Sequence, residues 1–331
     1  MSLTFFAPAL NLSMQLAEDY DLDVNAILVK VDIDPASIAD HNARIPTTKV
    51  FDFFQQIADE ISKPNFALEA GKYWHPTQMG ALGYAWMTSS TLRSAFERLV
   101  RYSRIVLGFV DITIEESATG LSLIFDFKNE SFAPAFRLDA NRSIILAMIQ
   151  SNAGQKFHPQ LVSFSHTEPE NISDFYALFQ CPVLFNTDVD SLTISLDEAD
   201  KPRTCSNKQL SQLHDQLLIE YVAKLDKNNV VERVKLAIIN ELGTGYFSDK
   251  IIAESLLMSQ RTLQRRLEEN NTTFKILVNE VRQDLADTYL NDSSLSLTEI
   301  SFMLGFSEMS SFSRAFKRWS GQSPRTYRVS H

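Results

Sequence analysis

The sequence predicts an α+β region followed by an all-α region. Its 331 residues suffice for about two domains at roughly 100–200 residues each. Strand-like alternation of apolar and polar residues occurs only before residue 200, whereas helical spacing alone continues from Asn229 to the end. With 44% hydrophobic and 22% charged residues, the composition is that of a folded globular protein and excludes a disordered or collagen-like chain.

The first region contains both periodicities. Apolar residues recur at three- and four-residue steps from Thr47 to Arg104 and again from Phe136 to Gln150, which predicts helices there. From Leu121 to Phe127 apolar and polar side chains largely alternate, which predicts a half-buried strand in a hairpin with Ile112–Glu115. Further short strands are expected at 161–165, 183–185 and 192–196.

A hinge at Asp197–Cys205 separates the two regions and precedes a predicted helix at Asn207–Leu225. The apolar stripe on this helix either packs within the chain or pairs with its copy in a homodimer. The stripe consists of Leu210, Leu213, Leu217 and Leu218. Seven helices are expected beyond it, at 230–242, 249–256, 260–269, 274–290, 297–303, 308–319 and 324–328. The predicted organisation is therefore a domain at 1–200, a linker region at 201–228 and a domain at 229–331.

Charge is distributed unevenly between the two regions. The whole chain has 31 basic and 41 acidic residues, a formal charge of −10. From Val231 to His331 there are 13 basic and 12 acidic residues, which leaves 18 basic and 29 acidic residues before them. The acidic first part disfavours contact with nucleic acid, but the nearly neutral second part allows it.

Motifs for catalysis and metal binding are missing from the sequence. Cys181 and Cys205 form no CxxC pair and indicate free thiols in a reducing cytoplasm. The six histidines form no HExxH, and the chain has no GxSxG, GxGxxG or P-loop. We therefore expect no metal, no cofactor and no enzymatic activity. The start, MSLTFFAPALNLSMQ, lacks the basic segment of a signal peptide, and no stretch is apolar enough to span a membrane, which predicts a cytoplasmic protein.

Two pairs of helices in the second region have the proportions of a helix-turn-helix unit, and the second helix of each pair has a divided surface. Large apolar residues gather on one side: Phe312, Phe316 and Trp319 in one helix, Leu263 and Leu267 in the other. The opposite sides carry Ser310, Ser313, Arg314 and Lys317 in one helix and Ser259, Arg261, Gln264 and Arg265 in the other.

The chemistry of these outer faces suits the major groove of DNA. Arginine can form two hydrogen bonds with guanine, glutamine can do so with adenine, and serine adapts to a base or a phosphate. Near the start of a helix seated in the groove, such side chains reach the base edges. A single polar helix face is commonly only a solvated surface, but its recurrence in two helices favours DNA contact.

Both regions also carry sequence motifs of a known family. The stretch Ile300–Arg328, ISFMLGFSEMSSFSRAFKRWSGQSPRTYR, resembles the signature of the AraC/XylS transcription regulators, with its GF turn, spaced S-F-R-F-K and closing G-x-S-P-x-x-Y-R. Ile252–Leu267 resembles the other half of that signature domain. In the first region, Gln78–Tyr84, Ser89–Tyr102 and Phe175–Phe185 are similar to the arabinose-binding-like effector domain of one branch of these regulators.

The resemblance implies two helix-turn-helix subdomains joined by one long helix, about 274–290, with both recognition helices in successive major grooves. It further implies a nucleoid-associated transcription regulator, most often an activator, that binds double-stranded promoter DNA as a homodimer and acts on RNA polymerase. By analogy, one DNA element would be contacted by Ser259, Arg261, Gln264 and Arg265, and the other by Ser310, Ser313, Arg314 and Lys317.

The resemblance also implies that the first region binds a small-molecule effector of unidentified chemistry. Aromatic candidates to line its pocket are Trp74, Tyr84 and Trp86, and candidates to bind an anionic group are Arg101, Arg137 and Arg142. Core packing and ion pairing are the alternative roles of these side chains. An alternative function is a constitutively DNA-bound regulator controlled by a protein partner. A DNA-modifying enzyme is disfavoured, because the sequence has neither an activated thiolate nor a cluster of zinc-binding cysteines.

Overall fold

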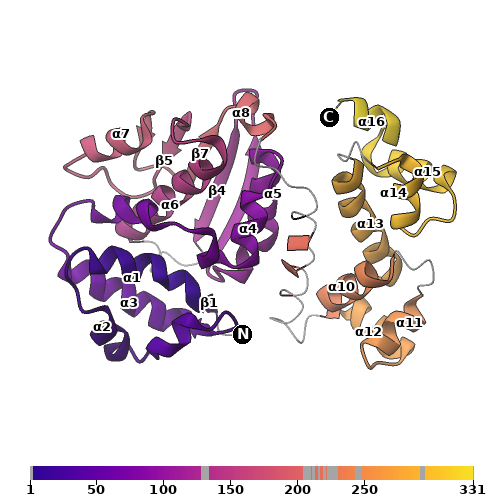
Figure 1. Cartoon of the computed structure of the whole chain (residues 1–331), viewed down its shortest axis with the longest axis horizontal. Coiled ribbons are helices and arrows are strands. Elements are labelled where there is room, and N and C mark those ends of the chain that lie inside the picture. Colours follow the sequence, from indigo (N-terminus) through magenta and orange to yellow (C-terminus); the bar gives the residue numbers. More distant parts are fainter. Residues whose placement is uncertain are drawn as a thin grey trace. The chain divides into compact units, whose positions relative to one another are not determined.

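The computed structural model describes residues 3–127, 134–203, 230–242, 248–290 and 295–330, together with residues 210, 213, 214, 217, 218 and 221. The chain divides into two compact units, Met1–Leu218 (unit 1) and Ile219–His331 (unit 2), and each is described by itself (Figure 1). Most of the helix expected at 207–225 lies outside the described residues, and the six residues described there are helical. Within the described part of the chain, every helix is too short or too polar to cross a membrane.

The main sheet of unit 1 has five strands in the order β3-β4-β7-β5-β6. Their bounds are Val110–Glu116 (β3), Leu121–Phe127 (β4), Leu161–Ser163 (β5), Val183–Leu184 (β6) and Asp190–Ile194 (β7). β5 and β6 are parallel, and the other neighbours are antiparallel. The predicted hairpin is confirmed as β3 and β4, with Ile112 opposite Phe125, and the predicted short strands are confirmed with small shifts of their bounds.

A second, two-stranded sheet was not expected from the sequence. It pairs β1 (Thr4–Phe6) with β2 (Arg44–Pro46) in antiparallel register. Each strand has only three residues, too few for an alternating pattern to be recognised. The side chain of Arg44 adds a hydrogen bond of 2.9 Å to the Thr4 carbonyl oxygen, which holds the two strands together beyond their backbone pairing.

The helix α6 (Ala135–Ala153) connects several elements of unit 1. The buried indole Nε1 of Trp86 donates to the carbonyl oxygen of Met148 at 2.8 Å. The Ser143 hydroxyl donates to the carbonyl oxygen of Leu68 at 2.6 Å. The other helices of unit 1 are α1 (Asn11–Glu18), α2 (Val24–Lys30), α3 (Thr47–Glu60), α4 (Ala81–Met87), α5 (Leu92–Tyr102), α7 (Ser173–Phe179) and α8 (Leu196–Asp200), with the 3₁₀ segment η3 (Phe66–Tyr73).

Charged side chains are buried where α6 packs against the main sheet. Arg142 is 0% exposed, its Nη2 lies 3.3 Å from Asp190 Oδ1, and its guanidinium lies 4.2 Å from the ring centroid of Phe125. Beside this pair, Asp139 Oδ1 and His166 Nε2 are 3.0 Å apart. Burial raises the pKa of Asp139, although its hydrogen bond to His166 acts in the opposite direction. The cluster fixes α6 to β7 through paired charges, because unpaired charges would be costly in this interior.

We expect unit 1 to lose stability as the pH rises through the titration of His166. Burial opposes protonation of His166, but its hydrogen bonds to Asp139 and to the Thr167 carbonyl oxygen, together with the charges of Asp139 and Asp190, outweigh burial and raise the pKa above the ordinary value of 6.5. The pKa of Asp139 is raised too, so the folded state binds more protons than the unfolded state, and stability falls with rising pH. The stabilisation is complete below the ordinary histidine pKa and lost above the raised one.

His166→Gln should therefore flatten the dependence of the free energy of unfolding on pH in the range above the ordinary histidine pKa of 6.5. Urea titrations followed by tryptophan fluorescence measure this, since Trp74 and Trp86 both lie in unit 1. The matched control is Gln155→Ala, at an exposed position of the same unit, which removes no titratable group and should leave the slope unchanged. An unaltered slope in His166→Gln would contradict the assignment.

Unit 2 is entirely helical in its described residues. Its helices are α10 (Val230–Leu242), α11 (Asp249–Ser255), α12 (Gln260–Glu269), α13 (Phe274–Leu290), α14 (Leu297–Met303), α15 (Met309–Ser320) and α16 (Pro324–Ser330). These agree with the seven predicted segments to within two residues at each end. The all-α prediction for this region is confirmed.

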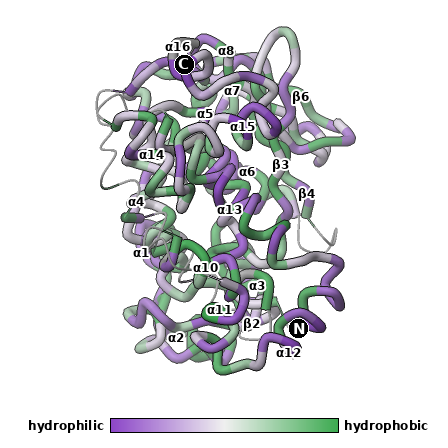
Figure 2. The backbone as a smooth tube through the Cα atoms, turned by 90° about the vertical axis from the view of Figure 1, so that its right-hand side faces the viewer, coloured by the Kyte–Doolittle hydropathy of each residue, from purple (hydrophilic) through white to green (hydrophobic). Residues whose placement is uncertain are grey.

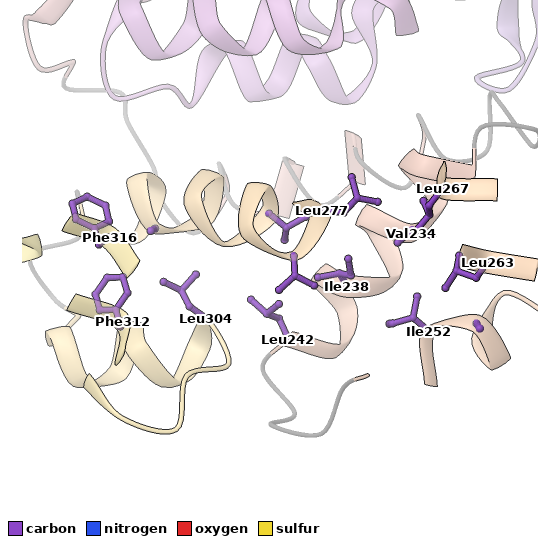
Figure 3. Packing of buried hydrophobic residues seen from close by; sticks show 14 of the residues in the cluster. Val234, Ile238, Leu242, Ile252, Leu263, Leu267, Leu277, Leu304, Phe312 and Phe316 are labelled. Carbon is purple, nitrogen blue, oxygen red and sulfur yellow. The ribbon is translucent and has the colours of Figure 1, made fainter. Parts of the chain in front are cut away.

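One continuous hydrophobic core joins the helices of unit 2. Its buried residues come from α10 to α15, and the long helix α13 contributes Leu277 to its centre. Figure 3 shows Leu277 and Ile238 lying between the cluster around Phe316 and the cluster around Leu263. Both helix-turn-helix pairs therefore pack on the same α10–α13 support.

Candidate nucleic-acid interface

The first helix-turn-helix unit consists of α11 and α12, and a serine caps each helix. The Ile251 N–H donates to Ser248 Oγ at 3.3 Å, and the Thr262 N–H donates to Ser259 Oγ at 3.2 Å. The turn between the helices passes through Leu257, whose φ is +57° and whose side chain is 95% exposed. Ser259, predicted to contact DNA, thus also fixes the start of α12.

The second unit, α14 and α15, has the same construction. Ser296 and Glu299 form a capping box at the start of α14, with reciprocal hydrogen bonds of 2.7 and 3.2 Å. The turn passes through Gly305, whose φ is +67°, a conformation that glycine adopts without a steric penalty. Gly321, with φ +78°, ends α15 in the left-handed conformation typical of helix C-termini.

The underside of each recognition helix is buried, and its opposite face is exposed. Leu263 and Leu267 of α12 and Phe312 and Phe316 of α15 are each 1% exposed or less. Hydrophilic residues predominate along α12 (Figure 2). Of the eight predicted DNA-contacting residues, Ser313 is half-buried and the others are exposed. The exposed seven are Ser259, Arg261, Gln264, Arg265, Ser310, Arg314 and Lys317.

Acidic side chains contact part of the exposed face of α12. Asp249 Oδ2 accepts hydrogen bonds from Gln260 Nε2 at 2.8 Å and from Gln264 Nε2 at 3.4 Å. Arg265 Nε lies 3.7 Å from Glu269 Oε1, one helical turn further on. Both contacts are at the surface and weak, so they can be exchanged for contacts with DNA at little cost.

The exposed face of α15 has a different pattern of contacts. The Ser310 hydroxyl donates to Glu308 Oε2 at 3.1 Å, and Arg314 Nη2 donates to Ser311 Oγ at 3.4 Å. Within the described part of the chain, neither Arg314 nor Lys317 forms an ion pair. These two cations are therefore available to an anionic partner.

Half-buried arginines hold the turns of both units, a role that the sequence analysis missed. Arg282 of α13 donates hydrogen bonds of 2.9 and 2.8 Å to the carbonyl oxygens of Leu304 and Gly305. Arg233 of α10 makes a longer hydrogen bond of 3.5 Å to the carbonyl oxygen of Leu256 in the first turn. Each is a single charge on an otherwise apolar helix face, and this pattern could have indicated a buried partner.

The two units repeat one arrangement. Arg265 and Arg314 are 49 positions apart, and each stands two positions after the first buried residue of its recognition helix. The same offset relates Glu268 to Lys317, so the second half of α15 is more basic than that of α12. Two surfaces of matching geometry thus present an arginine at the same position.

Unit 1 contains an apolar cavity of about 160 Å³. Of the six candidate effector-binding residues, Trp74 and Arg137 line it. The guanidinium of Arg137 lies 4.0 Å from the ring centroid of Phe51, and burial lowers its pKa to about 10. Arg137 therefore remains cationic at neutral pH.

The other four candidates do not line this cavity. Trp86 and Arg142 are both 0% exposed, and the core contacts described above account for them. Tyr84 is 41% exposed, and Arg101 is exposed on α5. Of the six candidates, Trp74 and Arg137 are thus the two that line this cavity.

An α+β unit joined to a helical unit with two helix-turn-helix pairs defines a DNA-binding transcription regulator. A profile described as "Arabinose-binding domain of AraC transcription regulator, N-term" matches residues 22–202, and one described as "Helix-turn-helix domain" matches residues 252–330. The chain belongs to the AraC family of transcription regulators. This family consists of regulators and not of enzymes.

Relatives and a solved structure agree with this classification. The ornithine utilization regulator of Pseudomonas aeruginosa is 24% identical over 320 residues, which cover 95% of this chain and 93% of that protein. The regulator VirS of Mycobacterium tuberculosis is 23% identical over 317 residues, with the same coverage. The crystal structure of the transcriptional regulator CdpR from P. aeruginosa aligns with a TM-score of 0.51 and 20% identity over 92% of this chain and 96% of that chain. The CdpR alignment shows a shared fold.

We expect Leu257→Gly to stabilise unit 2. A leucine in the left-handed conformation is strained by roughly 1–2 kcal/mol, part of which the greater unfolded-state entropy of glycine offsets. Since the leucine side chain is almost fully exposed, little packing is lost. The free energy of unfolding should rise by up to about 1 kcal/mol, measured by urea titration of the helical circular dichroism signal. Leu257→Ala, which retains Cβ, is the control, and equal stabilisation by both substitutions would refute the strain argument.

Proposed function

We propose that this regulator is a sequence-specific activator that binds promoter DNA through α12 and α15 and responds to a small-molecule effector. The observation that carries the DNA-binding part is the repeated recognition face. Each helix buries an apolar underside in one common core and exposes serine and arginine side chains on the other side, with a glutamine in α12 and a lysine in α15. These side-chain types suit base edges and phosphates in the major groove.

The connection between the two faces supports simultaneous contact with successive major grooves. α13 has 17 residues and is therefore about 25 Å long. Its side chains belong to the same core as the undersides of both recognition helices. A rigid connection of this kind avoids the entropy cost of ordering a flexible linker when the second face binds.

The exposed residues divide into two proposed roles. Arg265 and Arg314 stand at the same place in their helices, and each would form hydrogen bonds with a guanine. Gln264 would give up its hydrogen bond to Asp249 and form hydrogen bonds with an adenine instead. The remaining predicted residues, Ser259, Arg261, Ser310, Ser313 and Lys317, would contact bases or phosphates around them.

Unit 1 is proposed to bind the effector and to dimerise. Its cavity supports control by a small molecule over control by a protein partner alone, because a fully packed interior would leave no space for a ligand. One relative regulates ornithine utilization, which supports a metabolite as the signal.

Dimerisation is supported by exposed leucines of the helix expected at 207–225. Exposed fractions are 44% for Leu210, 51% for Leu213 and 43% for Leu217, so this apolar stripe could pair with its copy in a homodimer. The dimer would act on RNA polymerase at the nucleoid, in the cytoplasm.

The charge difference between the two parts of the chain fits an effector-binding role for unit 1 and a DNA-binding role for unit 2. The part before Val231 has 29 acidic and 18 basic residues, and its negative charge would limit nonspecific attraction to DNA. Specific contacts from unit 2 would then contribute a larger share of the affinity.

Arg265→Ala and Arg314→Ala test the DNA-binding proposal. If each arginine reads a guanine, each substitution should weaken binding to the preferred site by about 1–3 kcal/mol and relax specificity at one position. Preferred sites are first selected from random duplexes by the wild-type chain, and fluorescence anisotropy is then measured on selected and scrambled duplexes at several salt concentrations.

Arg266→Ala, at an exposed position of α12 outside the proposed face, is the matched control and should bind as the wild type does. An even loss across all sequences with a shallower salt dependence would assign the arginines to phosphates instead. Unchanged binding in both variants would refute the proposed interface.

A further inference from the structure

The two recognition helices begin in different ways. Two residues separate Leu257, the left-handed residue of the first turn, from the start of α12 at Gln260. The second of them, Ser259, caps the helix by accepting a hydrogen bond of 3.2 Å from the Thr262 N–H. The start of α12 is therefore fixed by a side chain of its own segment.

The turn before α15 is one residue longer and has a different helix start. Three residues separate Gly305 from the start of the helix at Met309. The residue at the cap position is Glu308, and within the described part of the chain its side chain accepts no hydrogen bond from the backbone of α15. A longer turn without a cap constrains the following helix less, so the direction of α15 depends more on contacts from outside the turn.

Arg282 of α13 supplies such contacts. Its Nε and Nη2 donate hydrogen bonds of 2.9 and 2.8 Å to the carbonyl oxygens of Leu304 and Gly305, where α14 ends and helix carbonyl groups lack intrahelical partners. The guanidinium also lies 4.2 Å from the ring centroid of Phe306. Because a guanidinium is planar and presents its donors in a fixed fork, these contacts fix the position of the turn relative to α13.

Phe306 connects the guanidinium of Arg282 to α15. The ring centroid of Phe306 lies 5.8 Å from that of Phe312 and 6.3 Å from that of Trp319. Phe312 is fully buried on the underside of α15, two positions before Arg314 on the exposed side. A displacement of the turn would therefore be transmitted through Phe306 to the helix that carries Arg314.

The first pair has a weaker version of this arrangement. The hydrogen bond from Arg233 of α10 to the Leu256 carbonyl oxygen is 3.5 Å long. Met258 follows the left-handed residue of this turn, as Phe306 does in the second, and a methionine side chain is flexible and adapts to its surroundings. α12 is thus held mainly by its own cap, whereas α15 is held mainly by the supporting helix α13.

We propose that Arg282 is a positioning residue that determines the specificity of α15 for its DNA element without contacting DNA itself. This inference rests on the proposed function, because it assumes that Arg314 forms hydrogen bonds with a guanine. Two hydrogen bonds between a guanidinium and a base require accurate placement of the helix, whereas phosphate contacts carry no sequence information. A displacement of α15 therefore reduces discrimination between sequences more than it reduces nonspecific affinity.

Arg282→Lys in the full-length chain tests the proposal, because lysine keeps the charge and loses the planar fork. Fluorescence anisotropy is measured on the selected duplex and on two duplexes in which one element at a time is scrambled. The element that α15 contacts is the one whose scrambling removes the effect of Arg314→Ala. Arg282→Lys should reduce discrimination at that element about tenfold and leave discrimination at the other element unchanged.

Discrimination is the ratio of the affinities for the selected and the scrambled duplex, and it separates positioning from a loss of folded protein. Unfolded chains lower the apparent affinity for every duplex by the same factor, so they leave the ratio unchanged. Phe306→Leu, which keeps Arg282 and removes the ring that joins it to α15, should lower the same ratio, and it decides the outcome if circular dichroism shows that Arg282→Lys does not fold. The matched control is Arg233→Lys, which should leave both ratios within about twofold of the wild-type values.

A double-mutant cycle shows whether Arg282 acts through Arg314. Arg314→Ala should weaken binding to the selected duplex about tenfold or more in the wild-type chain and about twofold or less in the Arg282→Lys chain, because the effects of residues in one network are not additive. Arg265→Ala, in the other recognition helix, should weaken binding by the same factor in both chains.

Three results would overturn the positioning role: equal loss of discrimination at both elements, unchanged discrimination in Arg282→Lys, or additive effects of Arg282→Lys and Arg314→Ala. These results leave the proposed interface intact as long as Arg314→Ala alone weakens binding. If Arg314→Ala binds as the wild type does, the proposed role of Arg314 is refuted, and the positioning role of Arg282 is refuted with it.

Discussion

The recognition surfaces depend on the burial of four apolar side chains beneath them. α12 has 10 residues and α15 has 12, and isolated helices of that length are only marginally stable in water. Leu263, Leu267, Phe312 and Phe316 each contribute about 1.5–3 kcal/mol when removed from water. Because this burial fixes the rotation of each helix about its axis, it also decides which residues remain outside. The identity of the residues exposed on each recognition helix is thus a consequence of core packing.

The helical unit could be predicted almost completely from the sequence, and the reasons for the exceptions are physical. The spacing of apolar residues repeats over whole helices, so α10 to α16 were found with small errors at their ends. The glycine at Gly305 indicates the turn between α14 and α15. The turn between α11 and α12 could not be predicted from Leu257, because leucine rarely adopts a left-handed conformation. The partners of Arg282 are carbonyl groups 22 and 23 positions away, which no local pattern reveals.

The effector-binding candidates were harder to predict, because an arginine on an apolar helix can face a cavity or a buried carboxylate. Arg137 and Arg142 are five positions apart on α6, which separates them by about 140° around the helix axis. They therefore face different surroundings, and Arg142 is the one that faces Asp190 of β7 in the core. Only the tertiary arrangement of α6 against β7 distinguishes them. Trp86 shows the same ambiguity for aromatic residues, since its indole is fully buried and bonded to Met148.

The common core beneath both helix-turn-helix pairs has a consequence for the operators that such a protein can use. α13 is continuous and packed along its length, so it cannot stretch to suit a different separation of the two DNA elements. One inserted base pair rotates the second element by about 34° around the duplex axis. If both helices bind as proposed, the DNA would have to twist or bend to restore the match. Easily deformed base steps between the elements would then be favoured although no side chain touches them.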